Sequence, residues 1–223
     1  MHRSKMAQDL TKVIILGAGG LAREVLWIFR EANKVEPRWD VLGFIDENPE
    51  NHGKVLCGLP VLGDFSWFAG GEGVKVICGI GNNRSRKKVV EKAKELKLEF
   101  CSIVDPTARM SSYVECGEGV VVASGNIITT QVQIGSHVFI NLANTIGHDA
   151  VIHDYVNLAP GNNVSGDVTL EEGVQVGTGC AIIPGVTVGE WSTIGAGSVV
   201  IRDIPPYSVA VGVPAKVIRT KEH

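Results

Sequence analysis

The sequence lacks the features that mark several large classes of protein. It has no basic excess, since 21 Lys and Arg stand against 24 Asp and Glu for a net charge of −3, which excludes an obvious electrostatic reader of nucleic acid. No apolar run approaches the roughly 20 residues needed to cross a bilayer, and residues 1–10 lack the apolar stretch of an export signal. The five cysteines form no CxxC pair, which favours reduced thiols. These absences predict a soluble, cytoplasmic protein that binds neither nucleic acid nor membrane.

What is present divides into two halves with different patterns. In the first hundred residues, apolar runs that end in turn residues alternate with amphipathic helical segments. Residues 12–20, 40–50 and 74–83 predict strands with their following turns, and residues 21–33 and 84–97 predict helices. This βαβαβ order predicts a parallel sheet with right-handed crossovers.

The second helical segment carries two sets of residues whose exposure can be predicted. Its apolar stripe is expected to be Val89, Ala93 and Leu96. Its basic residues are expected to form a solvated face rather than a phosphate site; they are Arg84, Arg86, Lys87 and Lys88.

A glycine-rich turn joins the first predicted strand to the first predicted helix. Residues 17–22, Gly-Ala-Gly-Gly-Leu-Ala, fit the pattern G-x-G-x-x-G/A, which brings backbone N–H groups and a helix N-terminus to a phosphate. The usual reading is a dinucleotide site with Asp46 on a ribose. Against it, this half is only about half of a full Rossmann domain. A second alternative is that the glycines serve only tight packing.

From Val104 onward the sequence repeats every six residues. Fifteen of the seventeen positions in the series are Ile, Val or Leu, far above chance, so this is a true internal repeat. The series is Val104, Met110, Cys116, Val122, Ile128, Ile134, Ile140, Ile146, Ile152, Leu158, Val164, Leu170, Val176, Ile182, Val188, Ile194 and Val200. A hexapeptide period predicts short strands joined by turns and wound into a solenoid. Because the period is unbroken, any catalytic side chain in this half must come from the coils themselves.

Three asparagines support a coil of 18 residues. Asn126, Asn144 and Asn162 interrupt a series of smaller residues at intervals of 18. Stacked one above another, they can form a hydrogen-bonded ladder inside the solenoid.

The repeat resembles the left-handed parallel β-helix of hexapeptide acyltransferases, and residues 212–216, Gly-Val-Pro-Ala-Lys, resemble the closing motif of their acetyl-CoA-dependent members. The whole combination GAGGLAREV, GFIDENP, GIGNNRSRKK, GHDAVIHD and GVPAKVIR resembles one subfamily, the bacterial nucleotide-sugar acetyltransferases. These include enzymes that N-acetylate UDP-4-amino sugars in bacillosamine synthesis, and sialic acid O-acetyltransferases. The implied fold is a Rossmann-like α/β domain over residues 1–103 and a left-handed β-helix over residues 104–223.

The resemblance implies roles for residues in both domains. In the family, the N-terminal domain holds the nucleotide of the sugar. That implies substrate-binding positions at Gly19, Gly20, Leu21, Asp46, Glu47, Gly81 and Asn83. Many members have histidine where this chain has Leu21, so one side-chain contact is lost although backbone donors remain. The implied acetyl-CoA contacts are Asn157, Thr178, Ala196 and Lys216. No metal is implied.

His148 and Asp149 occupy the place where the family has a histidine followed by an acidic residue as the general base. The chemistry requires such a group, because an amine that attacks a thioester must lose a proton, and an imidazole can accept it near neutral pH. A neighbouring carboxylate fixes the tautomer of the ring. His153 is expected to be a tolerated turn residue, and His137 to lie on the surface.

The resemblance therefore predicts an enzyme that transfers acetyl from acetyl-CoA to the amino group of a nucleotide-linked amino-deoxy sugar. It also implies a homotrimer with active sites between subunits. Two alternatives stay open. One is an O-acetyltransferase of sialic acid or another polysaccharide sugar, and the other is a non-catalytic trimeric sugar-nucleotide-binding protein. The sequence does not distinguish uracil, thymine or guanine as the base.

Overall fold

The computed structural model describes residues 10–70 and 73–221. Residues 1–9 lie outside these ranges. The prediction that this segment lacks an export signal therefore concerns residues that the structure does not describe. Among the described residues, no helix combines the length and the apolar character needed to span a membrane.

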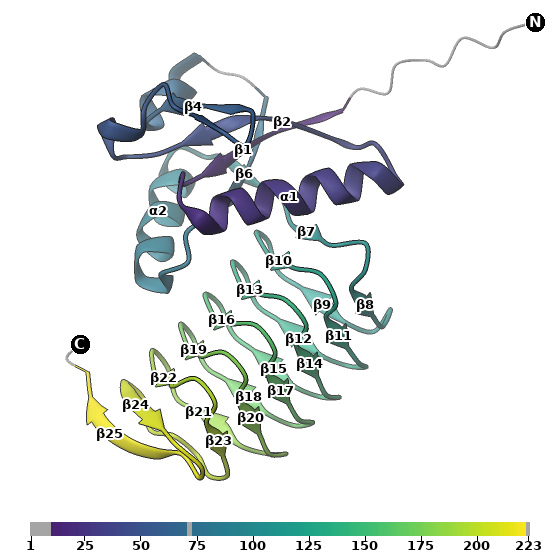
Figure 1. The fold of residues 1–223 in the computed structure, drawn as a ribbon, viewed down its shortest axis with the longest axis vertical. Helices are drawn as coiled ribbons and strands as arrows, with labels where there is room; N and C mark the ends of the chain where they lie inside the picture. The colour runs from purple at the N-terminus through teal and green to yellow at the C-terminus, as the bar shows by residue number, and fades with distance from the viewer. Residues whose placement is uncertain (1–9, 71–72, 222–223) are drawn as a thin grey trace, which may run out of the picture.

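The first hundred residues form one six-stranded sheet with two α-helices (Figure 1). In chain order its elements are β1 (Thr11–Leu16), α1 (Gly20–Val35), β2 (Trp39–Ile45), the 3₁₀ helix η1 (Pro49–Asn51), β3 (Val55–Leu56), β4 (Leu59–Gly63), the 3₁₀ helix η2 (Phe65–Gly70), β5 (Lys75–Cys78), α2 (Asn83–Glu95) and β6 (Glu99–Phe100). The strand order is β3-β4-β2-β1-β5-β6, and every pair except β3–β4 is parallel. The predicted parallel α/β sheet is confirmed, with an additional β3–β4 hairpin at its edge.

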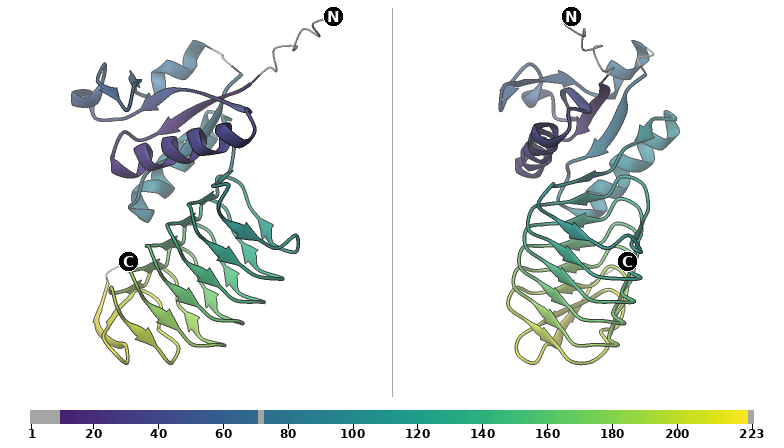
Figure 2. Two further views of the ribbon diagram at one scale, coloured as in Figure 1. Left: turned by 45° about the vertical axis from the view of Figure 1, so that its right-hand side comes forward. Right: turned by 90° about the vertical axis from the view of Figure 1, so that its right-hand side faces the viewer.

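The rest of the chain winds into a prism of two-residue strands (Figure 2). The strands are β7 (Ile103–Val104), β8 (Arg109–Met110), β9 (Glu115–Cys116), β10 (Val121–Val122), β11 (Ile127–Ile128), β12 (Gln133–Ile134), β13 (Phe139–Ile140), β14 (Thr145–Ile146), β15 (Val151–Ile152), β16 (Asn157–Leu158), β17 (Asn163–Val164), β18 (Thr169–Leu170), β19 (Gln175–Val176), β20 (Ala181–Ile182), β21 (Thr187–Val188), β22 (Thr193–Ile194) and β23 (Val199–Val200). Two longer strands, β24 (Ser208–Val211) and β25 (Lys216–Thr220), close the C-terminal end.

From β7 to β23, every third strand belongs to the same parallel sheet, so the prism has three faces; β24 extends face 1 in parallel and β25 is added to it antiparallel. Face 1 runs from β7 through β10, β13, β16, β19 and β22 to β24 and β25. Face 2 runs from β8 through β11, β14, β17 and β20 to β23. Face 3 runs from β9 through β12, β15 and β18 to β21. Paired residues are 18 apart within these strands, as in Val121 with Phe139, which confirms the predicted coil length.

The aliphatic hexad series forms the core of the prism, as predicted. Two of its members, Val104 and Cys116, are nevertheless exposed. They pair with Val122 and Ile134, which are buried, so they occupy the same register in the first coil. Their exposure follows from having no coil before them.

The asparagine ladder is present, and its bonds run from side chain to backbone. The side-chain oxygen of Asn126 accepts from the backbone N–H of Asn144 at 2.9 Å. That of Asn144 accepts from Asn162 at 2.9 Å, and that of Asn162 from Cys180 at 2.8 Å. Each asparagine is fully buried, so the ladder satisfies polar groups inside the coil and holds successive coils in register.

The N-terminal domain packs on the first coils of the prism. Outward residues of face 1, Ile103, Val121 and Phe139, share one apolar cluster with Ala22 and Val25 of α1. In Figure 1 the α/β domain lies at the β7 end of the prism, with α2 running down beside it. The two domains are therefore joined by a packed apolar interface.

The prediction for α2 is partly wrong. Ala93 is buried as predicted and Val89 is half-buried, but Leu96 is exposed, and the other buried residues are Asn83, Arg86 and Val90. Arg86, expected on a solvated face, is 2% exposed and donates to the backbone oxygens of Ile80, Tyr155 and Val156. Burial lowers the pKa of Arg86 to about 10. The prism covers this side of the helix, and a charged residue is tolerated there because carbonyl oxygens accept its N–H groups.

The prediction that His137 lies on the surface is also wrong. The ring is 1% exposed, stacks on Tyr155 with centroids 5.4 Å apart, and meets the edge of Phe100 at 4.6 Å. Burial lowers the pKa of His137 to about 4, and the charge of Lys94 acts in the same direction. His137 thus forms part of the contact between the domains.

Candidate active site

The glycine turn, Asp46 and Gly81 meet at one edge of the N-terminal sheet. They follow β1, β2 and β5 respectively, and these three strands are neighbours in the order β2-β1-β5. The carboxyl ends of adjacent parallel strands form the crevice in which open α/β sheets bind ligands. Gly81 lies beside Leu21, since a Cβ on Gly81 would sit 3.6 Å from Cδ2 of Leu21. The structure therefore brings these predicted substrate-binding positions together.

The turn itself is open on the outside and tight on the inside. A Cβ on Gly19 would meet nothing within 4 Å, and one on Gly20 would meet only the Arg23 guanidinium at 3.8 Å. Gly17, by contrast, has φ of +101° and lies against Ile80, so this position requires glycine. The open side leaves room for a phosphate to approach the backbone.

Asp46 stabilises this turn by hydrogen bonding. One carboxylate oxygen accepts from the N–H of Ala18 at 2.8 Å, and the other accepts from Asn48 N–H at 2.9 Å and Asn51 Nδ2 at 3.2 Å. Both oxygens are thus already engaged, and Asp46 supports the shape of the site through the turn.

Glu47 and Asn83 are bonded to residues outside the glycine turn. Glu47 forms an ion pair with Lys92 of α2 at 2.9 Å, with both side chains about half exposed. The amide of Asn83 donates to the backbone oxygen of Gly173 in the prism. Asn83 is therefore placed at the contact between the domains.

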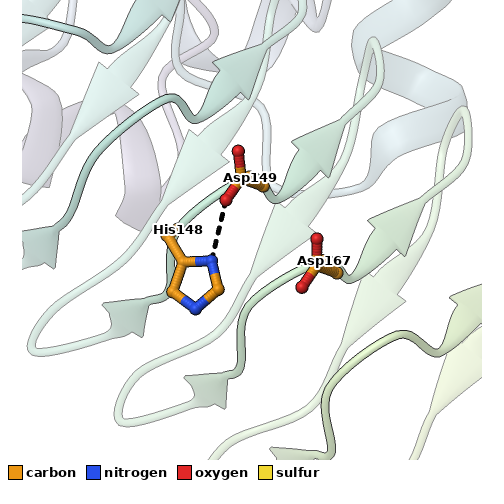
Figure 3. A group of neighbouring side chains, drawn as sticks. All are labelled: His148, Asp149 and Asp167. Carbon is orange, nitrogen blue, oxygen red and sulfur yellow. Dashed lines mark hydrogen bonds and ion pairs between the residues drawn. The ribbon is translucent and has the colours of Figure 1, made fainter.

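His148 and Asp149 lie on the turn between β14 and β15, the corner where face 2 meets face 3. The ring Nδ1 is 2.8 Å from Oδ2 of Asp149, and the side chains are 60% and 47% exposed (Figure 3). Asp149 has φ of +58°, a left-handed conformation that aspartate tolerates better than most residues. With Nδ1–H donated to Asp149, Nε2 would be the free acceptor of the ring.

The next coil supplies two residues that the sequence analysis did not identify. Gly166 lies against the His148 ring, because an added Cβ would come within 2.6 Å of Cε1 and 2.7 Å of Nε2. Asp167 brings a second carboxylate beside the ring (Figure 3). They stand 18 residues after His148 and Asp149, so the coil length could have identified both.

His148, Asp149 and Asp167 also form a potential metal site. One donor atom from each lies within 4.8 Å of the others, and all three residues are exposed. No other such group occurs in residues 10–70 and 73–221. A metal ion held by these three exposed residues would keep open coordination positions. The 2.8 Å contact between His148 and Asp149 has the length of an ordinary hydrogen bond, so the pair does not require a metal ion.

The residues predicted to contact acetyl-CoA lie elsewhere on the prism. Thr178 and Ala196 are exposed at the corner of faces 1 and 2, one coil apart, and the oxygen of Thr178 accepts from Gly197 N–H at 2.8 Å. Asn157 is half-buried on face 1, and Lys216 is exposed at the start of β25. Within one chain, face 2 separates the corner of Thr178 and Ala196 from the corner of His148.

His153 lies on the turn after β15 and is exposed. It lines a shallow groove of about 330 Å³ on face 3 together with Cys116, Gly135 and Asp154. It lies about five residues beyond His148 along the chain, past β15.

Family models match both domains of the chain. The model described as the PglD N-terminal domain matches residues 12–93, and the bacterial transferase hexapeptide model, of six repeats, matches residues 167–202. A search of curated protein sequences gave no significant match.

Solved structures resemble the chain over nearly its whole length. A mutant of perosamine N-acetyltransferase from Caulobacter crescentus, in complex with CoA and GDP-perosamine, is 32% identical with a TM-score of 0.86, covering 96% of this chain and 99% of that one. The acetyltransferase domain of PglB from Neisseria gonorrhoeae, in complex with acetyl coenzyme A, is 27% identical with a TM-score of 0.84, covering 94% and 100%. WeeI from Acinetobacter baumannii is 26% identical with a TM-score of 0.84, covering 93% and 100%.

The repeat and the three-faced prism define a left-handed β-helix of the hexapeptide transferase class. Combined with the PglD-type N-terminal domain, they show that the chain belongs to the bacterial nucleotide-sugar acetyltransferases, which are acetyl-CoA-dependent enzymes.

Proposed function

We propose that the chain N-acetylates a nucleotide-linked amino-deoxy sugar, with acetyl-CoA as the acetyl donor and His148 as the general base. The observation that carries the proposal is the pair of His148 and Asp149 on an exposed corner of the prism, 2.8 Å apart. The solved relatives that bind CoA with GDP-perosamine, or acetyl-CoA alone, support the choice of substrates.

The N-terminal domain, residues 1–103, would hold the nucleotide. The outward side of Gly19 and Gly20 can admit a diphosphate, because no protein atom crowds it. The N-terminus of α1 begins at Gly20, and its unpaired N–H groups favour an anion there. Asp46 maintains the turn, and Leu21 with Gly81 borders the same edge.

The β-helix domain, residues 104–223, would hold acetyl-CoA between two subunits of a trimer. Thr178 and Ala196 lie on a different corner from His148, with face 2 between them. We therefore assign the two corners to neighbouring subunits. His148 of one prism would face the thioester, and Thr178 and Ala196 of the next prism would contact the rest of the acetyl-CoA molecule. Asn157 and Lys216 would extend the cofactor surface on the second prism.

The reaction needs one base and one leaving group. The amine nitrogen attacks the thioester carbonyl carbon, a C–N bond forms, and Nε2 of His148 takes the proton that the nitrogen loses. The C–S bond then breaks, and the thiolate of CoA leaves with a proton returned by the imidazolium. Asp149 holds Nδ1 throughout and stabilises the charged ring. Proton transfer to a positioned base such as His148 is typically worth roughly 10²–10⁴ in rate.

The test is an acetylation assay on UDP-, dTDP- and GDP-linked 4-amino-6-deoxy sugars. The reaction is measured by the release of free CoA thiol, and the product is identified by its mass. We expect one nucleotide series to be acetylated on nitrogen. His148→Ala should lower kcat by roughly 10²–10⁴-fold while acetyl-CoA still binds. Acetylation of a hydroxyl alone would favour the O-acetyltransferase, and binding without turnover would favour the non-catalytic protein.

His153→Ala is the matched control, because it removes a second exposed histidine one turn further along the same chain. It should retain most activity. Light scattering should give about three times the chain mass of 23.8 kDa. An active monomer would contradict the shared site.

A further inference from the structure

We propose that Asp167 determines the choice of an amine over a hydroxyl as the acetyl acceptor. This inference rests on the proposed function, because it concerns the group that attacks the thioester at His148. It adds a specificity-determining residue to the site.

Asp167 stands one coil above Asp149 in the same column of the prism. Both residues have φ of +58°, and the backbone N–H of Asp167 donates to the oxygen of His148 at 2.9 Å. A donor atom of each of the three residues lies within 4.8 Å of the others (Figure 3). The ring of His148 is thus accompanied by two carboxylates from successive coils.

The two carboxylates are not equivalent. That of Asp149 is bonded to Nδ1 of His148, whereas the carboxylate of Asp167 accepts no hydrogen bond from any described residue. Other turn aspartates of the prism have structural partners, since Asp154 accepts from Ser136 N–H at 2.7 Å and Asp203 from Thr187 N–H at 2.8 Å. Asp167 therefore keeps its acceptor capacity for a ligand at His148.

The number of hydrogens on the nucleophile gives this carboxylate its effect. A neutral amine has two N–H groups and one lone pair, so it can donate one hydrogen to Nε2 of His148 and the other to Asp167 while the lone pair faces the thioester. A hydroxyl has one hydrogen. Once that hydrogen is directed to His148, only oxygen lone pairs face the Asp167 carboxylate, and this contact is repulsive. A site with this carboxylate therefore favours an amine over a hydroxyl as the nucleophile.

The test compares amine and hydroxyl acceptors that differ in one group. The probes are UDP-, dTDP- and GDP-linked 4-amino-6-deoxy sugars, each paired with the counterpart that carries a 4-hydroxyl. For the series that the wild type acetylates, we measure kcat/KM on both members of the pair. Asp167→Asn suits the left-handed backbone and offers an N–H donor to hydroxyl lone pairs.

We expect Asp167→Asn to lower kcat/KM for the amine by roughly 10–100-fold and to leave or raise that for the hydroxyl, with the KM for acetyl-CoA unchanged. Asp167→Gly, which also fits the backbone, removes both the contact with the amine and the repulsion of the hydroxyl, so it should lower kcat/KM for the amine and raise that for the hydroxyl less than Asp167→Asn does. Asp40→Asn, an exposed carboxylate on β2, makes the same change in net charge and should change neither value.

If the wild type acetylates the amine and Asp167→Asn leaves the ratio of kcat/KM for the amine to kcat/KM for the hydroxyl unchanged, the role of Asp167 is refuted and the proposed function still stands. A wild type that acetylates no amine would overturn both. EDTA should have no effect on the ratio or the rate. If EDTA abolishes activity and Zn²⁺ restores it, the three side chains act as metal ligands and the assignment to the amine fails.

Discussion

Replacing Gly166 by alanine tests whether the position of the His148 ring limits catalysis. Gly166 does not lie in the left-handed region, so the backbone accepts alanine. The new Cβ would lie 2.6 Å from Cε1 and 2.7 Å from Nε2 of His148, whereas ordinary contacts begin at 3.4 Å. The ring must therefore move by about 0.8 Å or rotate away from its place.

The cost of this movement can be estimated. A displacement of about 1 Å at a reacting group can lower a rate by about 10²-fold, so we expect kcat to fall by roughly 10–100-fold. Stability should change little, because the ring can turn into solvent and only the exposed hydrogen bond between His148 and Asp149, worth about 1 kcal/mol or less, is lost. For a chain of this size that corresponds to a shift in Tm of no more than about 4 °C.

The assay is steady-state kinetics on the preferred amino sugar, with thermal unfolding of each variant. The double variant His148→Ala/Gly166→Ala provides the control, because alanine at 166 should cost nothing further once the ring is gone. If Gly166→Ala retains wild-type kcat, or if its effect adds fully to that of His148→Ala, the contact between glycine and ring does not position the base.

Further predictions concern the two domains and their contact. Gly20→Val should raise the KM for the nucleotide sugar by about 10-fold or more, because it fills the open side of the turn, and leave the KM for acetyl-CoA unchanged; equal weakening of both would instead indicate a damaged fold. Burial lowers the pKa of His137 from 6.5 to about 4, so between these values the unfolded chain binds a proton that the folded protein does not. The contribution of His137 to the free energy of unfolding is therefore fully present above about pH 6.5 and is lost as the pH falls to about 4. His137→Phe, at a corner position where Tyr155 and Trp191 show that rings fit, should therefore lose less Tm between about pH 7 and pH 4.5 than the wild type. Equal losses in scanning calorimetry would place the acid sensitivity elsewhere.

The prism could be predicted from the sequence because one rule, an inward aliphatic every six residues, acts on every coil. The same regularity made the stacking of Asn126, Asn144 and Asn162 predictable. The glycine turn and Asp46 were also predictable as neighbours, because strand order places the ends of β1 and β2 side by side.

The contact between the domains could not be predicted in the same way. The apolar periodicity of α2 suggested Val89, Ala93 and Leu96. Ala93 is buried, but the prism covers the face of the helix that also carries Arg86. His137 is buried for the same reason, since α2 and Phe100 belong to the other domain. Gly166 and Asp167 were overlooked although the coil length of 18, applied to His148 and Asp149, leads directly to them.

The stacked coils also make the prism a molecular ruler. Neighbouring strands in a sheet are about 4.8 Å apart, so each coil adds one fixed step along the axis. Ala196 stands 48 residues beyond His148, fewer than three coils, which corresponds to roughly 13 Å. No described loop interrupts the strands from β7 to β23 to absorb a different length. In the proposed site, where Ala196 contacts the acetyl donor and His148 lies at its reacting end, a donor of another length could be matched only by moving the contact residue along the prism axis in whole coils, that is, in fixed steps of about 4.8 Å.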